Sequence, residues 1–324
     1  MAEPLVSVII VHWNEAELLR NCLRSLERSD YPNLEIIVSD NHSTDDGVAM
    51  VRKEFPRVQV IANEDNLGFA RGNNVGIRAS KGVYVAILNA DTIVEPTWIR
   101  LQVEALEADP TIGMCQGKMM LMREPGKINS VGMTLTREGL IKHIGDGEVD
   151  AGQHATQRPI FAVSGACAFC RRRMLDRIGL FDEDFFVYCE DWDLSWRAWI
   201  GGWRCVYVPD AVLHHFRNFT VEANSSLYWY LRYLNHRNRI WTLLKNASWP
   251  TLLTHSPSQL WYDLVMTGKG LKAWLTRSRE PVELKARWDA LCRLPRMLRK
   301  RRELQRTRVT PEAQIRELAF AQPP

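Results

Sequence analysis

A nearly unbroken run of apolar and β-branched side chains at residues 5–13 (LVSVIIVHW) constrains the fold most. A half-exposed strand would alternate polar and apolar positions, so this run predicts a strand buried on both faces of a sheet. Five apolar residues from Leu18 to Leu26 follow at helical spacing, with Pro32 beyond them. A buried strand followed by an amphipathic helix predicts a parallel sheet covered by helices.

The alternation of strands and helices continues along the chain, which has 324 residues and is 46% hydrophobic. We therefore expect an α/β domain whose mostly parallel central sheet is flanked by helices at residues 1–220, and a basic helical extension at residues 221–324. Strands are expected at residues 34–39, 58–62, 83–88 and 203–208, and helices at residues 48–55, 73–80 and 194–200.

Charge is divided unevenly between these two regions. Residues 221–324 carry 19 Lys and Arg against 8 Asp and Glu, a net charge of +11, and the first 220 residues carry −7. The acidic body argues against nucleic acid as a partner. The extension also holds six tryptophans and a dense basic cluster at residues 293–302 with interleaved leucines, so it predicts contact with an anionic membrane surface. The alternative is that these helices pack on the catalytic domain and the arginines are solvated.

The chain shows no leader-like pattern at its N-terminus, and its longest uncharged run, residues 246–262, is broken by Pro250 and Pro257. The seven cysteines are scattered and odd in number, which is typical of free thiols in a reducing compartment. These features predict a cytoplasmic protein, peripheral on the inner face of the cell membrane.

Polar residues follow each of the first four predicted strands, at residues 12–15, 40–46, 63–66 and 89–91. The carboxyl ends of parallel strands meet at one edge of a sheet, where ligands of such folds bind. The sequence therefore predicts one shared ligand site at this edge.

Asp91 ends the fourth strand, and a carboxylate there is a natural ligand for Mg²⁺ or Mn²⁺, which take few protein carboxylates together with substrate phosphates. The alternative is that Asp91 caps the segment that opens with Pro96. His214 and His215 follow a late strand. Such a pair is more often structural, but near Asp91 one imidazole becomes a further metal ligand.

Two other clusters are suited to a nucleotide. Residues 40–46 (DNHSTDD) offer acceptors to a base and a ribose, although the same residues favour a plain turn. In residues 66–76, Gly68 and Gly72 would admit a diphosphate to the backbone, Arg71 would neutralise it, and a helix opening near Asn73 would offer N–H groups.

Residues 190–193 (EDWD) crowd three carboxylates among aromatic side chains. Such crowding indicates a partly desolvated cleft with a reactive carboxylate. The alternative is a solvated acidic start of a helix.

These clusters, in this order, resemble glycosyltransferase family 2, which has the GT-A fold, and most closely its rhamnosyltransferase-like branch of bacterial cell-surface polysaccharide synthesis. The match spans about residues 6–220. It is carried by the motifs VSVIIVHWNEAELLRNCLRSL, IIVSDNHSTDDG, NLGFARGNNVGI, LNADT, GACAFCRRRMLDRIGLFDEDFFVYCEDWDLSWRA and VPDAVLHHF.

The resemblance implies an inverting, metal-dependent transfer of a sugar from a dTDP- or UDP-sugar donor to a hydroxyl of a glycan or lipid-linked acceptor. Asp191 matches the general base, beside Glu190. Asp91 matches the metal ligand of the family's DxD motif, whose first acid is Asn89 here, and His214 or His215 matches a late metal-associated histidine. The residues implied in donor binding are His12, Asn14, Glu15, Asp40, Asn41, Ser43, Asp45, Asn66, Gly68, Arg71, Asn73, Asn89 and Ala90.

Rival enzymes of similar pattern need glycines after the first strand. A dinucleotide-dependent dehydrogenase would carry G-x-G-x-x-G there, but the strand ends in HWNE. A nucleotidyltransferase would want a loop rich in glycine and lysine at the same point. A non-catalytic nucleotide-sugar-binding protein of the same fold is the remaining alternative.

Overall fold

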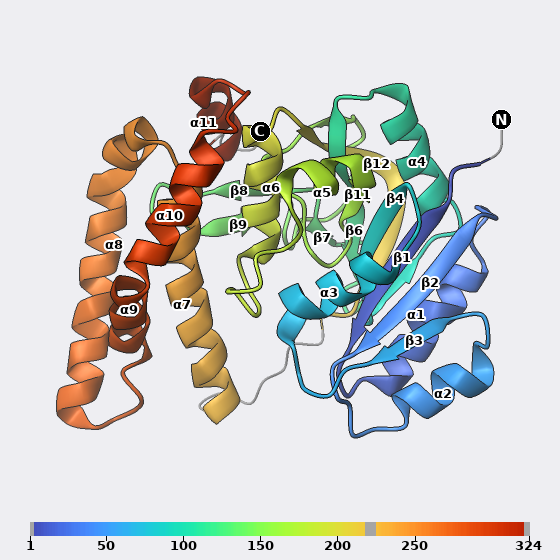
Figure 1. The fold of residues 1–324 in the computed structure, drawn as a ribbon, viewed down its shortest axis with the longest axis horizontal. Coiled ribbons are helices and arrows are strands. Elements are labelled where there is room, and N and C mark those ends of the chain that lie inside the picture. The colour runs from blue at the N-terminus through green and yellow to red at the C-terminus, as the bar shows by residue number, and fades with distance from the viewer. Residues whose placement is uncertain (1–2, 218–224, 321–324) are drawn as a thin grey trace.

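The computed structural model describes residues 3–217 and 225–320, and its centre is a ten-stranded sheet of order β10-β12-β6-β11-β4-β1-β2-β3, with β5 beside β12 and β7 beside β6 (Figure 1). The longer strands all run in one direction and the short ones run opposite. This confirms the predicted α/β fold with a mostly parallel sheet. The long strands are β1 (Val6–His12), β2 (Leu34–Asp40), β3 (Gln59–Ala62), β4 (Tyr84–Asn89), β6 (Ile112–Leu121) and β12 (Arg204–His215), and the short ones are β5 (Thr92–Val94), β7 (Ile128–Ser130), β10 (Arg158–Pro159) and β11 (Phe169–Arg171).

Strand β1 is buried on both faces, as its continuous apolar sequence predicts. Val8 and Ile10 belong to one core cluster and Ile9 to the other, because successive side chains of a strand point to opposite faces. The two clusters are the two faces of the sheet. One is covered by α1 (Ala16–Glu27), α2 (Gly47–Glu54) and α4 (Trp98–Ala108), and the other by α3 (Gly68–Ala79), α5 (Arg172–Ile178) and α6 (Glu190–Ile200).

Two helices begin earlier than the sequence predicts. Helix α3 starts at Gly68, whose φ of +71° suits glycine and whose N–H donates to Asn66 Oδ1. Asn73 therefore lies inside the helix, so the predicted opening near it was wrong. Helix α6 starts at Glu190 rather than residue 194, so its carboxylates occupy the first turn, where the helix dipole favours negative charge.

The C-terminal part of the described chain is helical and lies on the side of the molecule opposite β3, beside a hairpin of β8 (Met133–Leu135) and β9 (Ile141–His143) (Figure 1). No helix within the described ranges is both long and apolar enough to cross a bilayer. The predicted domain boundary at Thr220 lies outside the described residues. The helices are α7 (Ser226–Asn246), α8 (Trp249–Thr276), α9 (Val282–Cys292), α10 (Leu294–Gln305) and α11 (Glu312–Phe320).

Part of the basic cluster of α10 faces the protein, whereas Arg299 and Arg302 are exposed. Met297 is buried against Phe185 and Trp241. Lys300 forms ion pairs with Asp182 and Asp184, and Arg301 donates to backbone carbonyls at the end of α7. The predicted membrane-facing role of this cluster was therefore wrong for these side chains, because they attach α10 to the rest of the fold.

Lys245 of α7 makes a second attachment. Its ammonium lies 2.7 Å from Asp182 and 2.7 Å from Asp193 of α6. Asp193 is fully buried and also accepts a hydrogen bond from Asn246. Helices α6 and α7 thus share one buried ionic network.

Candidate active site

The polar clusters that follow β1, β2 and β4 meet at one edge of the sheet. His12 is in register with Asp40, and Val11 is in register with Asn89. The backbone N–H of Asn41 donates to the carbonyl of His12, with 2.8 Å between nitrogen and oxygen. The structure therefore brings together the strand ends that sequence reasoning singled out.

Some of the expected donor-binding residues hold this edge together instead of facing a ligand. Asp45 accepts hydrogen bonds from the N–H groups of Ala16 and Gly47 and from buried His12. Burial raises the pKa of Asp45, but these hydrogen bonds outweigh it and hold that pKa below its usual value. His12 and Asp45 are internal supports that join the starts of α1 and α2.

A second tie joins the loop after β1 to the loop after β2. Asn14 has a φ of +55°, and its Oδ1 accepts the N–H of Thr44 at 2.7 Å. Its own N–H donates to Ser43 Oγ at 3.1 Å. Glu15 stands at the N-terminal end of α1. Asn14 and Ser43 therefore set the shape of the loop around Asp40.

Asp40 has an oxygen available to a ligand. The side chain is buried, and its Oδ2 accepts the N–H of Ser43 at 3.2 Å. Its Oδ1 is also buried and has no hydrogen-bond partner among the described residues. A buried, unpaired carboxylate oxygen is costly, so this atom is suited to accept a hydrogen bond from a bound molecule.

The glycines of the third cluster lie close to protein side chains. A Cβ on Gly68 would lie 2.5 Å from the ring of Phe186, and one on Gly72 would lie 3.0 Å from Asn41 Oδ1. Asn41 Nδ2 donates to the carbonyl of Gly68 at 2.9 Å. The Cβ positions of both glycines therefore face protein atoms, and the approach of a diphosphate to their backbone stays a prediction.

The other residues of this cluster are also engaged with protein. Asn66 caps the start of α3 through Gly68, and Asn73 Nδ2 donates to the carbonyl of Phe69 at 2.9 Å. Arg71 is exposed and lies 3.8 Å from Glu183. The buried Oδ1 of Asn73 lacks a hydrogen-bond partner among the described residues.

Asp91 and His215 form a nearly buried pair at the end of β12. Asp91 Oδ1 lies 3.2 Å from His215 Nε2, and the other ring nitrogen, Nδ1, lies 2.8 Å from Asn129 Oδ1. His214 lies instead 3.0 Å from Glu95. Adjacent residues of a strand face opposite ways, so only His215 meets Asp91.

This pair is suited to a divalent ion, although it supplies only two protein ligands. Within residues 3–217 and 225–320, no three His, Cys, Asp or Glu side chains are grouped as a metal site. Asn129 would hold the Nδ1–H of His215 and leave Nε2 free to bind metal. Asn89, which ends β4, and Ala90, which is buried, precede Asp91, and β5 begins at the next residue. The remaining ligands would have to come from a donor's phosphates and water.

Asp191 and Glu190 occupy the first turn of α6. Asp191 accepts the N–H of Gly165 at 3.0 Å and its neighbour's N–H at 2.8 Å. Burial raises the pKa of Asp191. These hydrogen bonds and the interaction with His143 oppose this shift, but the pKa stays above its usual value. Burial, and then the charge of Asp191, raise the pKa of Glu190 well above its usual value. Glu190 is therefore the more readily protonated member of the pair, and Asp191 the better candidate base.

A short segment joins the two carboxylate sites. The carbonyl of Ala166 accepts the N–H of Asn89, and the N–H of Gly165 donates to Asp191. His143 of β9 interacts electrostatically with both Asp191 and His215, and burial lowers its pKa. Sequence reasoning missed His143 and Asn129, because neither belongs to a motif and both reach the site through long-range packing.

The loop before Glu190 is held in an unusual conformation by α7. Phe186, Tyr188 and Cys189 have φ values of 67°, 71° and 72°, which are costly for residues other than glycine. The buried amide of Asn238 lies 2.9 Å from each of the carbonyls of Phe185, Val187 and Tyr188. A side chain of the C-terminal helices thus orients the loop that carries the two carboxylates.

Comparison with known proteins agrees with this geometry. The family described as "Glycosyl transferase family 2" matches residues 7–179. An N-acetylglucosaminyl-diphospho-decaprenol L-rhamnosyltransferase from Mycobacterium tuberculosis is 27% identical over 236 residues, which cover 65% of this chain and 76% of that protein. An uncharacterized glycosyltransferase from Haemophilus influenzae is 37% identical over 112 residues, and a protein of Sinorhizobium fredii is 29% identical over 226. The match to the Haemophilus influenzae protein covers 34% of this chain and only 35% of that protein. The match to the Sinorhizobium fredii protein covers 65% of this chain and only 24% of that protein.

Solved structures show the same fold. GalNAc-T7 with UDP, GalNAc and Mn²⁺ superimposes with a TM-score of 0.61 at 18% identity, covering 75% of this chain and 48% of that one. A mannosyltransferase of Pyrobaculum calidifontis with GDP-Man and Mn²⁺ gives 0.57 at 20% identity, covering 95% and 86%. The fold is therefore GT-A, and since the family match covers more than half of the chain, this protein belongs to glycosyltransferase family 2, where it is rhamnosyltransferase-like.

Proposed function

We propose that this protein transfers a sugar from a nucleotide-diphosphate donor to an acceptor hydroxyl, with inversion at the anomeric carbon. The observation that carries this proposal is the joining of two sites by one short segment. The carbonyl of Ala166 accepts the N–H of Asn89, two residues before Asp91, and the N–H of Gly165 donates to Asp191. Sugar transfer needs two groups in one site. One stabilises the charge of the leaving diphosphate, and the other accepts the proton of the attacking hydroxyl.

Asp91 and His215 are the residues that would hold a divalent ion, Mg²⁺ or Mn²⁺. Such an ion offsets the negative charge that gathers on the departing diphosphate. Two structures of the same fold contain Mn²⁺. The hydrogen bond between His215 and Asn129 fixes the ring so that Nε2 faces Asp91. His214 has no part in this proposal.

Asp191 acts as the general base. It takes the proton of the acceptor hydroxyl while the oxygen forms a bond to the anomeric carbon, and the bond from that carbon to the diphosphate oxygen breaks with its electron pair. A raised pKa makes Asp191 a stronger base than an ordinary aspartate. One displacement from the face opposite the leaving group inverts the anomeric configuration.

The donor is proposed to be a dTDP- or UDP-sugar, with rhamnose as a candidate because a rhamnosyltransferase is among the relatives. Asp40 Oδ1 would accept a hydrogen bond from the base or ribose. That relative's name describes a diphospho-decaprenol acceptor. We therefore propose a glycan attached to a lipid through a diphosphate as the acceptor here.

A lipid-linked acceptor places the enzyme at a membrane, and we propose the outer face of α8 as its contact surface, on the cytoplasmic side. Large apolar side chains project from one side of this helix: Leu253, Leu260 and Trp261 are 72%, 67% and 67% exposed. Tryptophan favours the membrane interface, and the +11 charge of residues 221–324 favours anionic lipids. The face consists of Trp249, Leu253, Leu260, Trp261, Leu264, Leu271, Trp274 and Leu275.

The test is an assay of transfer and of slow donor hydrolysis with a panel of dTDP-, UDP- and GDP-sugars, with Mn²⁺ and with EDTA. The acceptor is a synthetic N-acetylglucosaminyl diphosphate with a short isoprenyl chain. We expect one donor to be consumed only when metal is present, and nuclear magnetic resonance of the product to show inversion. A retained configuration would overturn the single displacement. Formation of sugar 1-phosphate and a nucleoside triphosphate from the nucleotide sugar and added inorganic diphosphate would favour a nucleotidyltransferase. Binding without turnover would favour a non-catalytic protein.

A further inference from the structure

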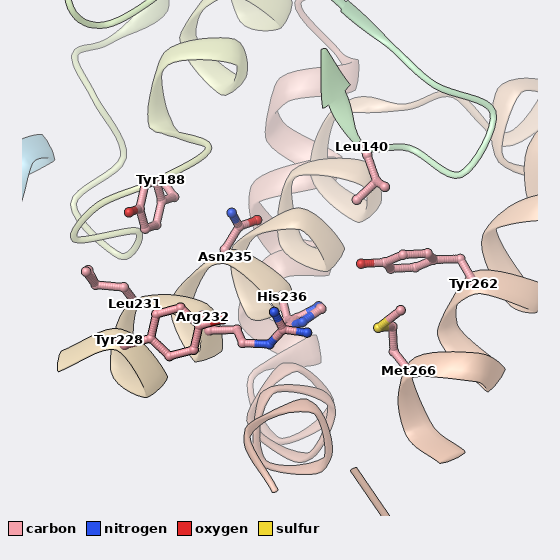
Figure 2. A pocket seen from close by; sticks show the side chains of 9 residues that line it. All are labelled: Leu140, Tyr188, Tyr228, Leu231, Arg232, Asn235, His236, Tyr262 and Met266. Atoms are coloured by element: carbon pink, nitrogen blue, oxygen red, sulfur yellow. The ribbon is translucent and has the colours of Figure 1, made fainter. Parts of the chain in front are cut away.

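A cavity of about 460 Å³ lies between α7, α8 and the loop before the candidate base (Figure 2). Two of its lining residues belong to segments that reach the active site. Tyr188 stands two residues before Glu190, and Leu140 stands three residues before His143. The cavity is thus built in part by the same loop and hairpin that carry groups of the active site.

The cavity combines apolar walls with polar groups. Tyr262 and Met266 of α8 face Arg232 and His236 of α7 across it (Figure 2). Leu231 adds a further apolar surface. A pocket of this composition is suited to a ligand with an apolar body and a polar or charged end.

Positive charge is in excess around this cavity. Arg279 binds both oxygens of buried Glu283 at 2.8 and 2.9 Å, whereas Arg232 approaches the same carboxylate only to 3.4 Å. Glu283 would therefore stay neutralised if Arg232 turned to a ligand. The guanidinium of Arg232 is partly exposed at the cavity wall.

A second pair of arginines shares one carboxylate in the same way. Arg239 and Arg287 lie 3.1 and 2.7 Å from Asp263, and Arg239 stacks over the ring of Tyr262. The positive charge of these arginines also acts on His236. Burial, and then the charges of Arg232 and Arg287, lower the pKa of His236 to about 4. Four arginines thus share two carboxylates near the cavity, which favours an anionic ligand.

We propose that this cavity binds the diphosphate end of the lipid-linked acceptor, with Arg232 contacting a phosphate and the apolar wall contacting the first isoprene units. The inference rests on the proposed function and assigns a site to its acceptor. The outer face of α8 bears the exposed apolar side chains described above, and its inner face lines the cavity. One helix would then contact both the membrane and the lipid carrier drawn from it.

The test measures binding of geranyl diphosphate to the full chain by calorimetry. We compare the wild type, Arg232→Gln and the matched control Arg299→Gln, which removes an equal charge from an exposed position on α10. The wild type should bind geranyl diphosphate, and inorganic diphosphate should bind at least about tenfold more weakly because it lacks the apolar part. Arg232→Gln should weaken geranyl diphosphate binding by about tenfold or more, and Arg299→Gln should not change it.

Three results would overturn the assignment: a wild type that does not bind the probe, an Arg232→Gln variant that binds it equally well, or displacement of the probe by UDP. The last would mean that the probe occupies the donor site. Binding of nucleotide sugars to the wild type, measured separately with Mn²⁺, tests the proposed function. A chain that binds no nucleotide sugar but binds geranyl diphosphate through Arg232 would contradict that function and leave this cavity assigned to an isoprenyl diphosphate.

Discussion

Replacing Asn238 by alanine should damage both stability and catalysis, because its amide is the contact that α7 makes with three carbonyls of the loop before Glu190. An amide has two N–H hydrogens, so the variant loses about two good hydrogen bonds to these buried carbonyls. It also loses the two that Asn238 Oδ1 accepts from Arg237 at 3.0 and 2.8 Å. At about 1–1.5 kcal/mol for each of these four bonds, the free energy of unfolding should fall by roughly 4–6 kcal/mol.

The same variant should lower kcat by about tenfold to a hundredfold, because misplacing a catalytic group by about 1 Å costs that much. The left-handed residues Phe186, Tyr188 and Cys189 would relax once the amide is gone, and Asp191 lies two residues after Cys189. Donor affinity should hold, since Asp40 ends β2 and is not part of this loop. The readouts are thermal unfolding, kcat and a calorimetric donor titration.

Two further variants make the result decisive. Asn238→Asp has nearly the same volume but no N–H donors, so it should behave like the alanine variant if hydrogen bonding is the cause. Asn21→Ala removes an exposed asparagine from α1 and should match the wild type. The reasoning is refuted if Asn238→Asp unfolds and turns over like the wild type.

Other predictions concern the site and the membrane. Asp191→Asn should reduce kcat by at least about 10²-fold with donor binding intact, and wild-type kcat/KM should fall on the acid side with an apparent pKa above that of an ordinary aspartate; unchanged turnover would exclude Asp191 as the base. Because the folded Glu190 carboxyl binds its proton more tightly than the unfolded one, stability should decrease as pH rises above the ordinary glutamate pKa, so Glu190→Gln should raise the unfolding temperature more at pH 8 than at pH 5. His215→Ala and Asp91→Ala should weaken Mn²⁺-dependent turnover, whereas His214→Ala should not; equal effects of the two histidine variants would contradict the pairing of Asp91 with His215. The wild type should pellet with anionic but not neutral vesicles, less so at high salt, and the double variant Leu260→Glu, Leu264→Glu should stay in solution; pelleting of that variant would rule out α8 as the contact.

The parts of this fold that the sequence predicts are those in which local pattern and tertiary environment agree. Strand β1 could be recognised because a strand between two helical layers must be apolar on both faces. Its polar end and that of β4 could be placed together because parallel strands end at the same edge. Both predictions follow from the order of apolar and polar residues along the sequence alone.

The roles of individual residues depend on contacts between distant segments, and the spacing of residues along the sequence does not reveal these contacts. Which histidine meets Asp91 depends on the phase of β12, whose pairing with β6 shifts register between Val208 and Val212. Gly68 was expected to admit a ligand, but the atoms that approach it belong to Phe186, more than a hundred residues later in the chain. Asn238 carried no signal, because a buried asparagine acquires its partners only when α7 packs against the loop.

The buried network around Asp193 bears on how this protein can be altered or diversified. Asp193 shares a helix with the candidate base, and its partners Lys245 and Asn246 belong to α7. Exchanging the C-terminal helices with those of a relative would leave this buried carboxylate with its ion pair to Arg197 of α6 alone, unless both α7 partners came with the graft. A chimera meant to change the acceptor should therefore be cut to preserve this triad. In evolutionary terms the two regions are expected to change together, as one inherited unit.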